Sequence, residues 1–192
     1  EKGIFRDKWG VIRAFGTEST PAPLEGPIKR PEDLKTYTAP DPTADDVLGQ
    51  LPEIVQRFKG RKAVTAICRD SYFNPAFLRG TTQFLMDMID NPKLVFELIE
   101  VCLSYDIPAM QRMVAAGVDV VVFGDDYADK NSTLMSPKHF KKFILPGLKR
   151  CVDAAHEAGA YVVKHTDGNI MQVIDMIVET GIDGLNPLEP PA

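Results

Sequence analysis

Three apolar runs in this chain each lead directly into a short polar segment, and helical segments lie between them. The three polar segments are Gly124-Asp125-Asp126-Tyr127, His165-Thr166-Asp167-Gly168-Asn169 and Asn186-Pro187-Leu188-Glu189. In a parallel α/β sheet or barrel, the carboxyl ends of all strands lie on one face, and ligands bind there. The pattern therefore predicts one site that gathers several carboxylates and one imidazole.

The stretches before and between these apolar runs have the sequence pattern of α-helices. Apolar side chains recur at helical spacing over residues 92–116, before the first run, and over residues 137–158, before the second. A shorter helix is expected over residues 170–180, before the third run. A glycine follows each of these helices, as is common where a helix ends. An earlier apolar run, residues 63–68, fits another buried strand. This alternation predicts right-handed βαβ units and a parallel sheet, in either a barrel or a doubly wound arrangement.

The N-terminal part of the chain differs from the rest. Residues 5–15 predict two short strands joined by a turn, and the proline-rich stretch 21–42 predicts an irregular, exposed connection. We therefore divide the chain into an N-terminal hairpin with its connection, residues 1–42, and central βα units, residues 43–192. A helix is expected to open the second part, over residues 43–58.

Composition narrows the classes of partner. With 192 residues and 44% hydrophobic residues, the chain can form one domain with a substantial core. A net charge of −5, without any basic run longer than a pair, argues against nucleic acid or an anionic membrane surface as a partner. No apolar stretch approaches the ~20 residues of a membrane-spanning helix. Three widely spaced cysteines without a Cys-x-x-Cys motif predict reduced thiols in a cytoplasmic protein.

Several short motifs are spread over most of the chain. They are Asp7-Lys8-Trp9-Gly10, Leu78-Arg79-Gly80, residues 115–119, Gly124-Asp125-Asp126, residues 136–140, Ile144-Leu145-Pro146, residues 165–169 and residues 181–190. Together these motifs resemble the uroporphyrinogen decarboxylase superfamily, which includes cobamide-dependent methyltransferases. The resemblance implies a TIM-type (β/α)8 barrel that this chain represents only in part, because complete members are longer at both ends.

Within that superfamily, the chain is most similar to methyltransferase-like members associated with corrinoid proteins. The zinc methyltransferases carry His-x-Cys where this chain has His165-Thr166-Asp167, so a carboxylate replaces the thiolate. Decarboxylases carry an arginine-rich N-terminal loop that grips substrate carboxylates, and these 192 residues contain no such loop. The resemblance implies methyl transfer between a small methylated or methoxylated substrate and a corrinoid protein or thiol acceptor, with Zn²⁺ as a Lewis acid.

His165 and Asp167 are the strongest candidates for catalytic residues. They stand two positions apart, so an extended backbone sends both side chains to the same side. Such a pair can bind a metal ion, or it can act as a base with an orienting carboxylate. The Asp167-Gly168-Asn169 sequence fits equally well an ordinary turn in which the Asp or the Asn caps the following helix. Asp126 is the third catalytic candidate, and Glu189 would complete a zinc site with His165 and Asp167.

Five further residues near the strand ends are candidates for substrate binding. They are Arg69, Tyr72, Asp125, Tyr127 and Asn186. Arg69 can clamp a substrate carboxylate and Tyr72 can donate a hydrogen bond, whereas a surface ion pair between Arg69 and Asp70 is the alternative. Asp125 and Asp126 are adjacent, so they point to opposite sides of an extended backbone. One of them is expected to face the site while the other braces the loop.

Two other functions remain open at this point. The first is decarboxylation of a porphyrinogen-like polycarboxylate without a metal, in which an aspartate would stabilise developing positive charge. The second is a catalytically silent barrel that serves as a binding subunit, because barrel folds are reused freely. A homodimer is one of the oligomeric states that the sequence leaves open.

Overall fold

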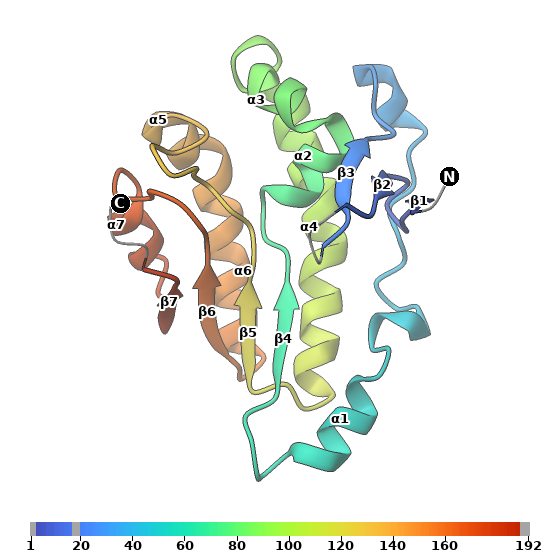
Figure 1. Cartoon of the computed structure of the whole chain (residues 1–192), viewed down its shortest axis with the longest axis vertical. Helices are drawn as coiled ribbons and strands as arrows, with labels where there is room; N and C mark the ends of the chain where they lie inside the picture. The colour runs from blue at the N-terminus through green and yellow to red at the C-terminus, as the bar shows by residue number, and fades with distance from the viewer. Residues whose placement is uncertain (1–2, 17–19, 189–192) are drawn as a thin grey trace.

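The computed structural model describes residues 3–16 and 20–188. Its centre is a four-stranded sheet in the order β4-β5-β6-β7 (Figure 1). All neighbouring strands pair in parallel, which confirms the βα units predicted from the apolar runs. The strands are β4 (Thr65–Cys68), β5 (Val120–Phe123), β6 (Tyr161–His165) and β7 (Gly184–Asn186).

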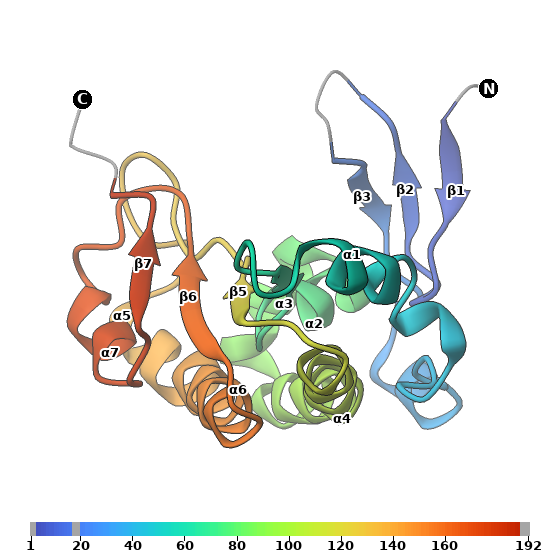
Figure 2. The same ribbon diagram turned by 90° about the horizontal axis from the view of Figure 1, so that it is seen from below.

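Two long helices pack along one side of this sheet (Figure 2). They are α4 (Pro92–Ala115) and α6 (Leu145–Glu157). Among the described residues, no helix is long and apolar enough to cross a membrane. The shorter helices are α1 (Leu51–Phe58), α2 (Phe73–Arg79), α3 (Thr81–Asp90), α5 (Pro137–His139), a π-helical segment Phe140–Ile144 and α7 (Ile174–Val178).

Side chains on the sheet alternate between two environments. Phe123 on β5 and Lys164 on β6 are fully buried on the side of the helices, whereas Ile67 on β4 is 75% exposed on the opposite face. Because side chains alternate along a strand, His165 points to the opposite face from its neighbour Lys164. The residues at the level of His165 are therefore turned away from the helices.

The N-terminal strands form a separate antiparallel sheet. It consists of β1 (Ile4–Arg6), β2 (Ile12–Ala14) and β3 (Ala22–Glu25), in that order. The hairpin predicted over residues 5–15 is confirmed, and the Asp7 carboxylate fixes its turn by accepting hydrogen bonds from the backbone N–H groups of Trp9 and Val11. The irregular connection predicted over residues 21–42 is wrong in part. It contains β3 and a 3₁₀ helix, Pro31–Lys35, because pairing with β2 satisfies the β3 backbone.

Two predicted helices are shorter than the sequence pattern indicates. The helix expected over residues 43–58 begins only at Leu51, after a 3₁₀ turn at Asp45–Val47. Pro52 lies in its first turn, where the missing N–H of proline costs nothing. The helix expected over residues 170–180 extends only over α7.

A repeated Gly-x-Asp sequence leads into β5 and into β7. Asp119 accepts a hydrogen bond from the backbone N–H of Val64 at 2.9 Å, beside the neighbouring strand β4. Asp183 accepts one from Val162 of β6 at 2.7 Å, in the same relation to its neighbour. The carboxylates thus join adjacent strands at the end of the sheet opposite to the polar segments.

Asp119 makes the stability of the fold depend on pH. The hydrogen bond from Lys59, followed by that from the Val64 backbone, lowers the pKa of Asp119 below its ordinary value of 3.8. A carboxyl with a lowered folded-state pKa stabilises the fold above the unfolded-state pKa, and this contribution is lost as the pH falls through the folded value. We expect Asp119→Asn to lower the melting temperature by a few degrees at pH 7, with a smaller difference from wild type below about pH 4. Thermal unfolding between pH 2.5 and 7 checks this, with the exposed Asp90→Asn variant as a control. A difference that does not change with pH would contradict it.

Candidate functional site

The carboxyl ends of the four parallel strands bring distant residues to one level. His165 pairs in register with Asn186 on β7. On the other strands, Phe123 of β5 pairs with Lys164, and Cys68 of β4 pairs with Phe123. The next residues along these two strands, Gly124 and Arg69, therefore lie in line with His165 across the sheet. The predicted convergence of polar residues at the strand ends is therefore present, and it includes one arginine.

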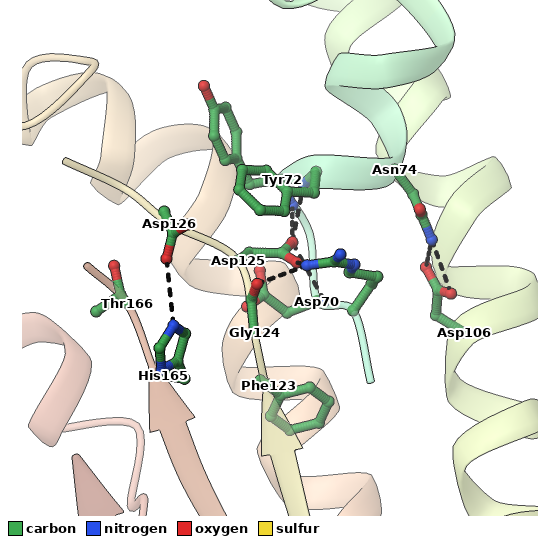
Figure 3. A network of polar contacts seen from close by, with 12 residues as sticks. Asp70, Tyr72, Asn74, Asp106, Phe123, Gly124, Asp125, Asp126, His165 and Thr166 are labelled. Carbon is green, nitrogen blue, oxygen red and sulfur yellow. Dashed lines mark hydrogen bonds and ion pairs between the residues drawn. The ribbon is translucent and has the colours of Figure 1, made fainter. Parts of the chain in front are cut away.

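Asp126, His165 and Asp167 form a compact group, called here the His165 cluster. Figure 3 shows two of its members, Asp126 and His165, facing each other. His165 Nε2 lies 3.8 Å from Asp126 Oδ1 and 3.6 Å from Asp167 Oδ1. One potential metal-ligand atom from each side chain lies within 4.8 Å of the other two. All three side chains are partly exposed, so the cluster is accessible from solvent.

Backbone contacts hold the two loops of the cluster together. The N–H of Asp167 donates to Asp126 Oδ1 at 2.9 Å, and the N–H of Asn169 donates to the Asp129 carbonyl at 2.7 Å. Gly168 lies between them with φ +88°, and a Cβ there would come within 2.6 Å of the Asp129 carbonyl oxygen. Only glycine therefore permits the close approach of these loops.

Asn186 orients the imidazole of the cluster. His165 Nδ1 lies 3.0 Å from Asn186 Oδ1, which fits donation of a proton from Nδ1 to the amide oxygen. In a neutral imidazole, Nε2 then carries the lone pair, and it faces two carboxylates. The Nε2 lone pair and the two carboxylates repel one another unless a positive charge lies between them, so the arrangement favours a bound cation.

Asp125 points away from the His165 cluster. Its side chain is fully buried, and Oδ2 accepts hydrogen bonds from the backbone N–H groups of Asp70, Tyr72 and Phe73 at 3.3, 3.2 and 2.8 Å. Burial, and then the charge of Asp70, raises the pKa of Asp125. Of the two adjacent aspartates, Asp125 braces the loop before α2, and Asp126 lies beside His165.

A buried network behind the cluster is not anticipated by the sequence patterns above. Lys164 Nζ donates to Asp70 Oδ2 at 2.9 Å and to the Asp125 carbonyl at 2.7 Å. The Tyr127 hydroxyl donates to the same Asp70 oxygen at 2.7 Å, and the Lys164 ammonium lies 4.1 Å from the centroid of the Tyr127 ring. Because Asp70 follows β4 and Asp125 follows β5, this one lysine of β6 connects three strand ends. A lysine inside the apolar run 160–164 is the signal that could have revealed it.

Comparison with known proteins identifies the family. The sequence profile of the family described as Uroporphyrinogen decarboxylase (URO-D) matches residues 5–187. This chain belongs to the uroporphyrinogen decarboxylase family. Two curated relatives of this URO-D chain are the methylcobamide:CoM methyltransferases MtbA of Methanosarcina acetivorans and Methanosarcina mazei. Each is 21% identical over 178 residues, which cover 91% of this chain and 52% of the relative.

A solved structure confirms the fold of this URO-D chain. A methyltransferase from Methanosarcina mazei aligns with a TM-score of 0.78 at 21% identity, over 93% of this chain and 52% of the other. The TIM-type barrel predicted from the sequence is therefore confirmed, and the four parallel strands are part of it. The chain spans about half the length of the relatives it matches.

The predicted substrate-binding residues of this URO-D chain have different surroundings. Tyr72 and Tyr127 are fully buried in an aromatic group, and no described residue hydrogen-bonds the Tyr72 hydroxyl. Asn186 contacts His165, as described above. The side chain of Arg69 is 32% exposed at the level of the cluster. Glu189, the predicted third zinc ligand, lies outside the described residues.

Proposed function

We propose that this chain carries the active site of a corrinoid-linked methyltransferase that acts on a small methylated or methoxylated compound. The His165 cluster is the observation that carries the proposal, because it places an imidazole and two carboxylates at the carboxyl ends of barrel strands. The family match and the methyltransferases among its relatives support the reaction class. The proposed acceptor or donor is a corrinoid on a partner protein.

The residues of the cluster fit a zinc ion. Imidazole nitrogen and carboxylate oxygen are common zinc ligands, and two ligands held at about 2.0–2.1 Å in tetrahedral geometry stand roughly 3.3 Å apart. The observed separations of 3.6 and 3.8 Å are close to this distance. Three protein ligands leave one position free, as in catalytic zinc sites. When bound, Zn²⁺ would act as a Lewis acid on the oxygen or thiol at which the methyl group is exchanged.

No thiolate ligand is available to the cluster in the described part of the chain. The three cysteines are unpaired and buried, and burial raises the pKa of all three thiols. Nitrogen and oxygen ligands donate less charge to a metal than thiolates do, so more positive charge stays on the metal. This favours a substrate whose leaving atom is an ether oxygen over one whose leaving atom is sulfur.

Asn186 is expected to act through His165. The Asn186→Ala variant should lower zinc affinity about 10- to 100-fold, because it removes the acceptor that fixes the imidazole. Competition with a chromophoric zinc chelator measures the affinity. Asn169→Ala serves as a matched control, since Asn169 lies in the loop beside the cluster and its amide donates to the Asn131 carbonyl. Unchanged zinc affinity in Asn186→Ala would contradict the orienting role.

Metal-free decarboxylation of a porphyrinogen is the second candidate, and Asp126 favours it. Its partly exposed carboxylate stands at the end of β5, where it can hydrogen-bond a pyrrole N–H. Turnover of uroporphyrinogen by protein treated with a chelator would support this reading. Turnover of a methoxylated compound only in the presence of zinc would support methyl transfer. A silent barrel would show neither activity.

A further inference from the structure

A cavity of about 230 Å³ lies beside β4 and near the His165 cluster's end of the sheet. The N-terminal hairpin, the end of β4, α2 and α4 all contribute to its lining. Its polar lining residues are Lys8, Arg69, Asn74, Tyr105 and Asp106. Ile67, Met110 and Met113 give it an apolar wall.

The charges in this cavity favour an anion. Lys8 and Arg69 supply two cations. Asp106 is the acidic residue in the lining, and both of its oxygens accept hydrogen bonds from the Asn74 amide, at 3.0 and 2.9 Å. Burial raises the pKa of Asp106. Two cations thus stand against one carboxyl group in this lining. The lining therefore carries an excess of positive charge.

Arg69 has an unused hydrogen-bonding edge. Its Nη1 donates to the Gly124 carbonyl at 2.5 Å and lies 3.5 Å from Asp125 Oδ1, and the guanidinium stacks over the Phe73 ring. These contacts fix the plane of the guanidinium. No residue in 3–16 or 20–188 accepts a hydrogen bond from Nε or Nη2 of Arg69. Those two nitrogens form the edge that binds a carboxylate with two parallel hydrogen bonds.

We infer that the substrate of the proposed methyltransferase is an anion whose carboxylate binds Arg69 while its methylated end reaches the His165 cluster. The placement of the methylated end at the His165 cluster rests on the proposed function, whereas the binding of the carboxylate to Arg69 does not. Arg69 follows β4 and His165 is the last residue of β6, with β5 between them, so their backbones stand roughly 10 Å apart. A single-ring aromatic acid, or an aliphatic acid of similar length, spans that distance.

Gly124 of the strand end between Arg69 and His165 leaves the space beside Arg69 free of a side chain. A Cβ on Gly124 would stand 3.2 Å from Ile67 Cγ2 and 3.8 Å from Arg69 Nη1. A side chain at this position would therefore crowd Ile67 and the guanidinium of Arg69. The backbone of Gly124 instead supplies the carbonyl that holds Arg69.

Calorimetric titration of the intact, chelator-treated protein with benzoate and with benzamide tests the inference. The two probes have nearly the same shape, and only benzoate is an anion. Chelation removes any metal that could bind the carboxylate itself. We expect benzoate to bind about tenfold or more tightly than benzamide, because it forms charged hydrogen bonds with Arg69. Arg69→Met should remove this preference, Arg69→Lys should restore part of it, and the exposed Arg61→Met should leave it unchanged.

Two results would overturn the inference. One is equal affinity of the wild type for the two probes, and the other is an unchanged benzoate preference in a folded Arg69→Met variant. Lys8→Met gives an independent check on a hairpin residue, and it should weaken benzoate binding with no effect on benzamide. Zinc content and methyl transfer of the untreated protein are measured separately. If the protein binds zinc and transfers methyl groups but does not prefer benzoate, the proposed function stands and this inference fails. If it prefers benzoate but binds no zinc, Arg69 is an anion site and the proposed function fails.

Discussion

Replacing His165 with alanine is expected to remove bound zinc and to lower methyl transfer by about 10³-fold. The imidazole is the only nitrogen ligand of the His165 cluster, and a Lewis acid lowers the barrier of such a transfer by several kcal/mol. Metal analysis of the intact protein measures zinc before and after the substitution. Single-turnover assays with a methoxylated substrate and a corrinoid acceptor measure the transfer.

His156→Ala is the matched control for this experiment. His156 pairs with Asp183 at 2.9 Å, at the opposite end of the sheet, so its loss should leave zinc content and methyl transfer unchanged. Asp167→Asn keeps the size of the side chain and should reduce zinc affinity without changing the fold. Full zinc content and normal transfer in His165→Ala would rule out a role for the cluster in binding the metal.

The second large effect is expected at Lys164. Lys164→Met should lower the free energy of unfolding by about 3–5 kcal/mol, because it leaves the Asp70 carboxylate buried without its ammonium partner. Both side chains of this ion pair are fully buried. The loops after β4 and β5 also lose their common connection, so the metal affinity of the cluster should fall as well. Urea unfolding at pH 7 measures the stability.

A double variant separates two effects of Lys164→Met, namely the unpaired charge left on Asp70 and the lost packing of the lysine side chain. Asp70→Asn together with Lys164→Met removes both charges, so it should be more stable than Lys164→Met alone. The exposed Lys141→Met serves as the control and should change the stability by less than about 0.5 kcal/mol. A loss below about 1 kcal/mol in Lys164→Met would show that the buried pair does not hold the strand ends together.

The sequence predicts the parallel sheet because its signals are local. Each strand is a short apolar run, and each long helix has helical spacing and a glycine after its end, as at Gly117 and Gly159. These patterns do not require knowledge of distant contacts. The predicted irregular connection over residues 21–42 shows the opposite case. Whether β3 forms depends on its pairing with β2, which a stretch of prolines does not reveal.

The sequence predicts several residues of the candidate site, but it does not predict all of their orientations and contacts. The spacing of His165 and Asp167 places them on one side of the backbone, and the structure brings Asp126 beside them. Adjacency alone cannot show which of Asp125 and Asp126 turns inward. That choice depends on three backbone N–H groups just before and at the start of α2, which donate hydrogen bonds to the Asp125 carboxylate. The partners of Lys164 also come from distant parts of the chain, so the network has no local pattern.

Zinc K-edge X-ray absorption of the intact protein tests the central proposal most directly. The proposal predicts about one zinc per chain, with a first shell of nitrogen and oxygen at about 2.0–2.1 Å and loss of that shell in His165→Ala. A sulfur shell at about 2.3 Å would contradict it, because the ligands would then be thiolates outside the His165 cluster. Absence of zinc from protein prepared with ample zinc would contradict it equally.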